Sequence, residues 1–231
     1  MESLSRAMNF KKIVLLFFVL VAVWALWQWL GRDHYLNYPP SARGPWVAFG
    51  DSLTEGYGAT EGQDYPSVLS KKLEVLIRNL GRSGENSADG MKRVDEVAGL
   101  HPRVVLLCFG GNDALNGDSA GKMFANISSI IDRLQREGCF VVLIGIRSAS
   151  LRDHYADHFK KLAHDKQVLF IPDLLSSLAF KPIYMSDAVH PNDMGYKRFA
   201  ERVAKALKPY LPELVMADKN PAQSKSASVD R

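Results

Sequence analysis

Beyond residue 45, short apolar runs alternate with longer segments in which apolar residues recur every three or four positions. The short runs predict strands, and the helical spacing predicts amphipathic helices. The charge of Arg78 inside the second run favours an edge strand. The expected strands are 46–49, 75–80, 104–109, 140–146 and 168–171, and the expected helices are 65–73, 88–98, 123–134, 151–164 and 193–207.

This alternation predicts an α/β fold, a three-layer sandwich in which helices cover both faces of a five-stranded parallel sheet. Right-handed crossovers leave few topologies, and the flavodoxin-like strand order 2-1-3-4-5 is the expected one. In such sheets, functional sites lie beyond the carboxyl ends of the strands. Polar residues that directly follow a strand are therefore the first candidates for chemistry.

The amino-terminal pattern is different, because residues 13–30 are apolar except for Gln28. As a helix, this run would span roughly 27 Å, enough to cross the core of a bilayer. Basic residues precede the run, three tryptophans lie near its end, and no small-x-small cleavage site follows. We expect an uncleaved transmembrane signal anchor with its amino terminus in the cytoplasm. A cleaved signal peptide, with the mature protein released to the periplasm, and a buried soluble helix are the alternatives.

These patterns predict five parts. They are a cytoplasmic amino terminus over 1–12, a transmembrane anchor over 13–30, a Pro- and Gly-rich linker over 31–45, a folded domain over 46–212 and a flexible polar tail over 213–231. Fully extended, the linker would hold the domain about 30 Å from the bilayer. A domain of about 170 residues is large enough to bury about 70% of its unfolded surface.

Composition excludes several classes of partner and cofactor. The formal net charge is only +4 and the basic residues are spread along the chain, so no nucleic-acid partner is expected. The sequence contains no dinucleotide fingerprint and no Walker A pattern, so no cofactor is expected. His154, Asp157 and His158 share a helix face but lack further ligands, so we expect a solvated face and no metal. Cys108 and Cys139 are expected to be buried free thiols, too far apart for a disulfide.

The strand ends carry a set of residues suited to nucleophilic catalysis. Ser52 follows the first strand, Gly84 the second and Asn112 the third, and Asp187 and His190 follow the fifth. A serine hydroxyl needs a base, which His190 can supply near neutral pH, and Asp187 can orient and stabilise the imidazole. The side-chain amide of Asn112 and the backbone N–H groups of Gly84 and Ser52 are candidate donors to an oxyanion. Together they predict an ester hydrolase with a Ser-His-Asp triad.

Other roles for single residues remain open. Ser52 could be a helix N-cap, and Asp187 could brace a loop. We expect a structural role for Asp113, at a turn after two glycines. Arg147, just beyond the fourth strand, could form a structural ion pair or contact the substrate.

These blocks resemble those of the SGNH, or GDSL, hydrolase superfamily over about residues 46–210. Its four name-giving residues match Ser52, Gly84, Asn112 and His190, and its catalytic aspartate matches Asp187 in the Asp-x-x-His-Pro block. Residues 49–54, 110–113 and 145–147 are most similar to the bacterial multifunctional thioesterase, arylesterase and lysophospholipase branch, whose members are typically exported. One departure is the pair that follows Gly84, Glu85-Asn86, where Asp/Glu-Thr is commoner.

The resemblance implies a serine esterase that hydrolyses acyl esters, thioesters or lysophospholipids, with a small acyl ester or a lipid as substrate. A carbohydrate O-acetyl esterase is one alternative, and a membrane-tethered, non-catalytic binding protein is another. We expect the catalytic domain on the periplasmic side of the cytoplasmic membrane, held by the single anchor. Acyl-chain length and head group depend on loops such as 116–120 and 148–154, which the motifs do not define.

Overall fold

The computed structural model describes residues 34–146, 155–175, 178 and 181–215, together with Leu15, Phe17–Val21 and Val23. The chain divides into two units, Met1–His34 and Tyr35–Arg231. The second unit contains the sheet, all of the helices named below and every candidate site residue.

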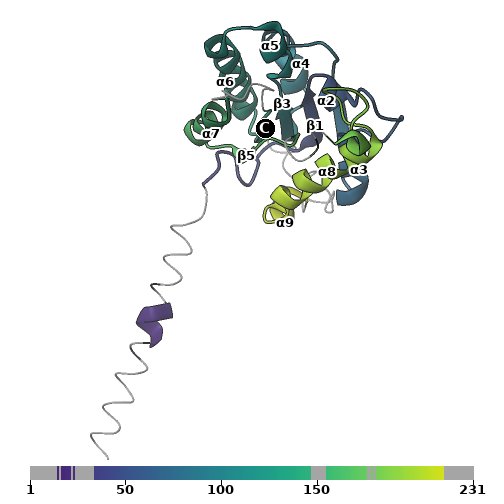
Figure 1. The fold of residues 1–231 in the computed structure, drawn as a ribbon. Coiled ribbons are helices and arrows are strands. Elements are labelled where there is room, and N and C mark those ends of the chain that lie inside the picture. The colour runs from purple at the N-terminus through teal and green to yellow at the C-terminus, as the bar shows by residue number, and fades with distance from the viewer. Residues whose placement is uncertain are drawn as a thin grey trace, which may run out of the picture. The chain divides into compact units, whose positions relative to one another are not determined.

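The sheet has five parallel strands in the order β2-β1-β3-β4-β5, which confirms the predicted topology (Figure 1). The strand β2 lies at the edge, and its Arg78 and Asn79 are exposed, as the charge in this run predicted. The strands are β1 (Gly44–Gly50), β2 (Ile77–Gly81), β3 (Pro102–Cys108), β4 (Phe140–Ile144) and β5 (Leu169–Ile171).

All five expected helices are present within the described residues, and two of them, α3 and α8, have the predicted bounds. Four further short elements, α2, α5, η1 and α9, were not predicted, because segments of three to six residues are too short to show helical periodicity. The elements are α2 (Ser52–Glu55), α3 (Tyr65–Leu73), α4 (Ser87–Ala98), α5 (Gly111–Asn116), α6 (Ala120–Arg136), α7 (Tyr155–Asp165), η1 (Pro182–Tyr184), α8 (Asp193–Leu207) and α9 (Leu211–Val215).

Two hydrophobic cores lie on opposite faces of the sheet, which is the predicted three-layer arrangement. Side chains alternate between them along β1: Trp46 and Ala48 belong to one core, and Val47 and Phe49 to the other. Helices α3 and α8 cover the first face, and α4, α6 and α7 cover the second (Figure 1). Because both faces are covered, the central strands are continuous apolar runs without alternation.

Both cysteines are buried free thiols, as predicted. Cys108 ends β3, and Cys139 directly precedes β4. Burial raises the pKa of Cys139 to about 12 and that of Cys108 well above its ordinary value. Neither thiol therefore ionises near neutral pH, which leaves both unreactive.

The predicted linker over 31–45 needs correction, because its second part packs onto the domain. The side chain of Asn37 donates a hydrogen bond to the carbonyl oxygen of Gln135 (2.8 Å). The ring of Tyr38 packs against that of Phe140, with 5.5 Å between centroids. The segment from Tyr35 onward thus belongs to the domain, and its aromatic side chains stabilise the docking.

The predicted tail over 213–231 also begins too early. Leu214 lies in the hydrophobic core within helix α9, so the ordered domain reaches at least Val215. The pattern missed this because one apolar turn among polar residues is a weak signal. Residues 216–231 lie outside the described residues.

Most of the predicted transmembrane segment over 13–30 also lies outside the described residues. Leu15, Phe17–Val21 and Val23 are helical and exposed. None of the helices in the described part of the chain has the length and apolar character needed to span a bilayer. The anchor therefore stays a prediction.

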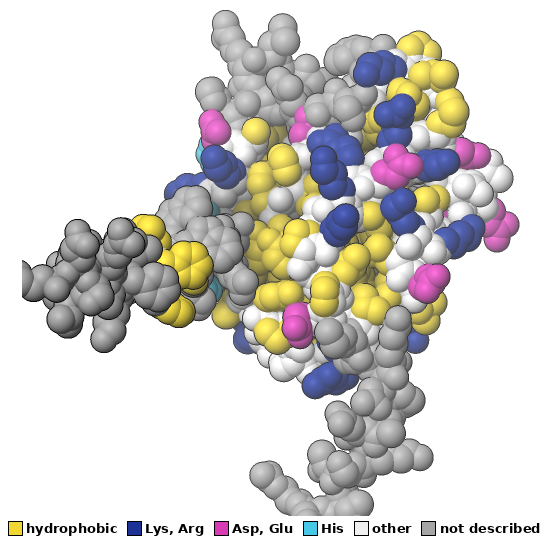
Figure 2. Space-filling view, turned by 90° about the horizontal axis from the view of Figure 1, so that it is seen from below, with side chains coloured by type: hydrophobic (Ala, Val, Ile, Leu, Met, Phe, Trp, Pro, Cys, Tyr) yellow, Lys and Arg dark blue, Asp and Glu magenta, His cyan; other side chains and the backbone are white. Residues whose placement is uncertain are grey.

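One face of the molecule combines basic and apolar side chains. In Figure 2, Lys and Arg side chains outnumber carboxylates and lie among exposed apolar side chains.

Candidate active site

Ser52 is placed by a tight turn between β1 and α2. The strand ends at Gly50, Asp51 caps the helix by accepting a hydrogen bond from the backbone N–H of Leu53 (3.0 Å), and Ser52 is the first helical residue. A Cβ atom on Gly50 would lie 2.2 Å from Oγ1 of Thr54, so only glycine fits there. Because Asp51 is the N-cap, the alternative role of Ser52 as a helix cap is wrong.

A continuous chain of hydrogen bonds joins three of the predicted residues. Nε2 of His190 lies 3.0 Å from Oγ of Ser52, and Nδ1 of His190 lies 2.7 Å from Oδ2 of Asp187. When the N–H at Nδ1 of His190 donates a hydrogen bond to the Asp187 carboxylate, Nε2 carries no proton and can accept a hydrogen bond from the Ser52 hydroxyl. Ser52 and His190 are 138 residues apart in the sequence, so the fold itself brings them together.

Asp187 is held in its charged form. Its Oδ1 accepts hydrogen bonds from the backbone N–H groups of Val189 (2.8 Å) and His190 (2.7 Å). Partial burial disfavours the charge, but these bonds and the contact with His190 outweigh it, so the pKa of Asp187 lies below its ordinary value. An ionised Asp187 stabilises a protonated imidazole.

The loop that carries His190 is fixed on both sides. Before it, Met185 forms an antiparallel bridge with Pro191. After it, Asn192 caps α8 by accepting a hydrogen bond from the N–H of Gly195 (3.1 Å). The position of the imidazole is therefore defined by backbone contacts as well as by its two side-chain partners.

Sequence reasoning did not identify Tyr57, which packs against the catalytic imidazole candidate. The ring of Tyr57 lies 4.5 Å from the ring of His190, centroid to centroid. Its side chain is 55% exposed. Tyr57 follows the serine by five residues, which gave no pattern signal, because the contact depends on how the loop after α2 folds.

Gly84 and Asn112, the predicted oxyanion donors, are linked through the residue Glu85. Nδ2 of Asn112 donates a hydrogen bond to the carbonyl oxygen of Glu85 (2.7 Å), the residue after Gly84. An amide nitrogen carries two protons, so the second remains available. Gly84 has φ +83°, a conformation that favours glycine. Within the described residues, the backbone N–H groups of Ser52 and Gly84 donate to no backbone carbonyl, so both are available to an oxyanion.

Glu85-Asn86 is the pair that departs from the commoner Asp/Glu-Thr, and the structure gives its asparagine a local role. Asn86 caps helix α4, accepting hydrogen bonds from the N–H groups of Ala88 and Asp89 (both 3.1 Å). Asp89 accepts in return from the N–H of Asn86 (3.3 Å). Asparagine is as good an N-cap as threonine or better, so the loop geometry is preserved.

Asp113 has the structural role that we expected. It is buried, and its carboxylate accepts hydrogen bonds from the N–H (2.9 Å) and the hydroxyl (2.6 Å) of Ser87. These bonds connect the start of α5 to the start of α4. Asp113 has no contact with His190, so Asp187 is the acidic partner of the imidazole.

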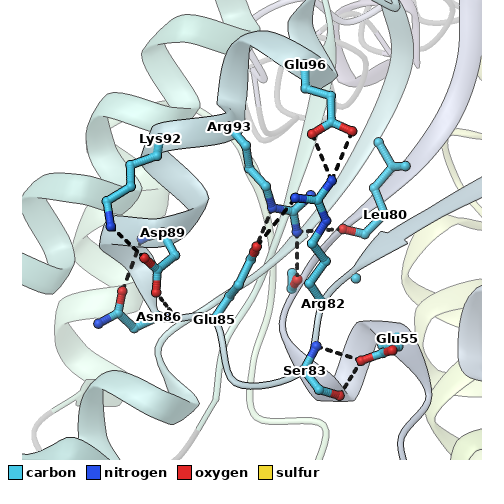
Figure 3. A network of polar contacts seen from close by, with 12 residues as sticks. Glu55, Leu80, Arg82, Ser83, Glu85, Asn86, Asp89, Lys92, Arg93 and Glu96 are labelled. Carbon is cyan, nitrogen blue, oxygen red and sulfur yellow. Dashed lines mark hydrogen bonds and ion pairs between the residues drawn. The ribbon is translucent and has the colours of Figure 1, made fainter.

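Sequence reasoning also missed the buried ion pair between Glu85 and Arg93, shown in Figure 3. Arg93 lies on the face of α4 that carries buried Gly90, Val94 and Val97. A charged residue on an otherwise buried helical face was the available signal, because such a charge needs a partner.

The remaining candidates are not placed at the site. His154 and Arg147 lie outside the described residues, and His158 stacks on Phe124 with 5.2 Å between ring centroids. Across residues 34–146, 155–175, 178 and 181–215, no group of three or more His, Cys, Asp or Glu side chains could hold a metal ion.

Comparison with known proteins identifies related sequences and folds. Residues 48–198 match the model of the GDSL-like Lipase/Acylhydrolase family. An arylesterase of Vibrio mimicus is 30% identical over 71% of this chain and 88% of its own length. Thioesterase 1/protease 1/lysophospholipase L1 of Escherichia coli K12 is 28% identical over 75% of this chain and 88% of its own length. The crystal structure of TesA superposes with a TM-score of 0.66 at 26% identity, covering 71% of this chain and 98% of that one.

The residue before the nucleophile candidate is itself unusual, because Asp51 is buried with few donors. Its side chain accepts a hydrogen bond from the N–H of Leu53 (3.0 Å), and its own backbone N–H makes a smaller contribution. Burial, together with the negative charges of Asp113 and Glu85, raises the pKa of Asp51 to about 7 although the Leu53 bond opposes this. The folded protein therefore keeps the Asp51 proton in a pH range in which the unfolded chain has lost it.

We expect Asp51→Asn to stabilise the protein above pH 7 and to have little effect below pH 4. Between these values, the unfolded chain ionises at Asp51 and the folded protein does not, so wild-type stability falls as pH rises. The upper limit of the difference is about 4 kcal/mol, since one pKa unit is worth about 1.4 kcal/mol. Asparagine keeps the N-cap acceptor. Urea unfolding of both proteins from pH 4 to 8 measures this, and a pH-independent difference would contradict it.

Proposed function

Because the chain belongs to the GDSL-like lipase/acylhydrolase family and is thus a hydrolase of ester bonds, we propose that Ser52, His190 and Asp187 form its catalytic triad. The observation that carries this proposal is the unbroken hydrogen-bond chain from Oγ of Ser52 through both ring nitrogens of His190 to Oδ2 of Asp187. This geometry is that of an activated nucleophile, whose base is oriented by a third group.

In the proposed acylation step, Oγ of Ser52 attacks the ester carbonyl carbon while its proton passes to Nε2 of His190. The carbonyl electron pair moves to oxygen, and the resulting oxyanion accepts hydrogen bonds from Asn112 Nδ2 and from the N–H groups of Ser52 and Gly84. When the tetrahedral species collapses, the C–O or C–S bond breaks, and His190 gives its proton to the leaving alcohol or thiol. Asp187 stabilises the imidazolium in between.

Deacylation repeats the same steps with water. His190 takes a proton from a water molecule, whose oxygen attacks the acyl-serine carbonyl carbon. Collapse of the second tetrahedral species releases the carboxylic acid and returns the proton to Ser52. The cycle needs no cofactor, because each proton moves between the substrate, water, Ser52 and His190.

We propose acyl esters, thioesters and lysophospholipids as the substrate class. The relatives named above are an arylesterase and a thioesterase/lysophospholipase, and they match most of this domain. The hydrogen-bonded triad favours an enzyme over a non-catalytic binding protein, because a binding protein has no need of an oriented base. No described residue specifically favours a carbohydrate O-acetyl ester.

We also propose that residues 13–30 hold the domain at the periplasmic face of the cytoplasmic membrane. The support is the length of the apolar run and the absence of a cleavage site after it.

We expect Ser52→Ala to abolish hydrolysis of a short p-nitrophenyl ester. Removal of a triad nucleophile costs on the order of 10⁴-fold or more. Ser129→Ala is the matched control, because Ser129 is an exposed serine on α6 that bonds only to the carbonyl oxygen of Ala125 within its own helix. Circular dichroism of both variants shows whether they fold. A folded Ser52→Ala protein with activity within tenfold of wild type would rule out the triad.

We expect Asn112→Ala to lower kcat by roughly 10²- to 10³-fold, because loss of one oxyanion donor removes about 3–4 kcal/mol of transition-state stabilisation. KM should change little, since the ground-state carbonyl depends less on this donor. Asn116→Ala, an exposed asparagine at the end of the same helix, is the control. A variant that changes only KM would make Asn112 a substrate-binding residue.

For the anchor, we expect residues 13–30 to be retained in the mature protein and to be recovered with the membrane fraction. Mass spectrometry of the protein from fractionated cells measures the mature amino terminus directly. A soluble mature form that begins near residues 31–45 would identify the segment as a cleaved signal peptide instead.

A further inference from the structure

Glu85 is bound at both its backbone and its side chain. Its carbonyl oxygen accepts the hydrogen bond from Nδ2 of Asn112 (2.7 Å), and its carboxylate accepts one from Nε of Arg93 (2.6 Å). Its backbone nitrogen is joined directly to Gly84. One residue therefore sits between the two proposed oxyanion donors that do not belong to the nucleophile turn.

Arg93 connects this residue to the sheet. Its Nη2 donates to the carbonyl oxygens of Leu80 (2.7 Å), near the end of β2, and of Gly50 (3.4 Å), at the end of β1. Its guanidinium lies over the ring of Phe49, 4.7 Å from the centroid. The planar, rigid guanidinium thus fixes Glu85 relative to the strand that ends two residues before Ser52 (Figure 3).

The pair is mostly shielded from solvent, unlike the exposed pair of Arg82 and Glu96 beside it, although Arg82 also lies 3.9 Å from the Glu85 carboxylate. The side chains of Arg93 and Glu85 are 8% and 17% exposed, whereas those of Arg82 and Glu96 are 54% and 46% exposed. A buried ion pair gains little net stability, because desolvation offsets much of the Coulomb attraction. Stability alone is therefore a weak explanation for its presence next to the proposed oxyanion donors.

Charge gives a second reason for the pairing. A carboxylate beside an oxyanion hole would repel the negative charge that develops on the substrate oxygen. The guanidinium of Arg93, together with that of Arg82 at 3.9 Å, offsets part of the negative charge of Glu85 while leaving its carbonyl oxygen to Asn112. The arrangement keeps the geometric benefit of Glu85 at a lower electrostatic cost.

We propose that the Glu85–Arg93 ion pair is a positioning unit for the oxyanion hole, which fixes the N–H of Gly84 and the side-chain amide of Asn112 before the substrate binds. This inference rests on the proposed function, because it concerns the transition state of the same reaction. Preorganised donors stabilise developing charge without reorganisation during the reaction. A misplacement of about 1 Å can cost on the order of 100-fold in rate.

The test compares Glu85→Gln with Glu96→Gln in the full-length protein, using p-nitrophenyl acetate. Both changes remove a carboxylate that binds an arginine, but Glu96 is exposed and has no bond to Arg93; its partner Arg82 keeps the longer contact with Glu85 (3.9 Å). We expect Glu85→Gln to lower kcat roughly 10- to 100-fold with KM nearly unchanged, and Glu96→Gln to behave like wild type. Glu85→Asp, which restores the charge on a shorter side chain, should recover part of the lost kcat.

A double-mutant cycle distinguishes positioning from a general structural role. If Glu85 acts through Asn112, the effect of Glu85→Gln on kcat should shrink at least threefold when Asn112 is already alanine. Should a variant fail to fold, Arg93→Lys provides the second measurement, because lysine keeps the charge but cannot bond Glu85 and Leu80 with a rigid fork. We expect it to lower kcat in the same range as Glu85→Gln.

The outcomes separate this inference from the proposed function. Ser52-dependent hydrolysis in wild type, with unchanged kcat in Glu85→Gln or additive effects in the cycle, would overturn the positioning role and leave the triad in place. Wild-type protein without Ser52-dependent hydrolysis would overturn both. A kcat loss that the Asn112→Ala background reduces supports the positioning unit.

Discussion

The parallel pairing of β1 between β2 and β3 is the constraint on which the site depends. Gly50 of β1 lies in register with Gly81 of β2 and with Cys108 of β3, so three chain segments leave the sheet at one level. Parallel strands require long crossovers, which bring distant parts of the sequence to a single edge. The nucleophile turn, the Gly84 loop and the Asn112 helix follow these three strand ends. Any shift of β1 by one residue would exchange the two cores and move Ser52 away from His190.

Much of this fold could be predicted because the sheet is buried on both faces. Continuous apolar runs are rare outside buried strands and long helices. Here each run was followed by a segment in which apolar residues recur at helical spacing. The domain boundaries that were predicted wrongly share a physical reason. Residues 35–45 and α9 pack on the domain through a few tyrosines, Asn37 and Leu214, and such contacts leave no periodic trace in a short segment. The edge strand β2 begins two residues later than expected, since Val75 is buried against α3 rather than paired in the sheet.

The predicted site residues that meet in space were recognisable because their chemistry and their place after strands coincide. A serine, a histidine and an aspartate at one sheet edge form a rare combination, and the hydrogen bonds bring the three together. Glu85 gave no signal in the sequence, and the charge of Arg93 on a buried helical face showed only that this residue needs a partner. Which partner it finds depends on a contact between a loop residue and a residue of α4 eight positions later, and so on the way α4 packs on the sheet. Sequence patterns show which face of a helix or strand is buried. They do not show the direction in which a long side chain extends toward a neighbouring segment.

In the proposed mechanism an oxyanion forms near several carboxyl groups, and the structure limits the negative charge that some of them present. Burial raises the pKa of Asp51, adjacent to the proposed nucleophile, to about 7, so this carboxyl is partly protonated near neutral pH. The carboxylate of Glu85 is bonded to Arg93, and that of Asp113 accepts two hydrogen bonds from Ser87. Asp187 contacts Nδ1 of His190, whereas Ser52 contacts Nε2, so its ionised carboxylate stabilises the cation that the proposed mechanism forms together with the oxyanion. The acidic group whose charge the proposed transition state needs is thus the one whose pKa lies below its ordinary value.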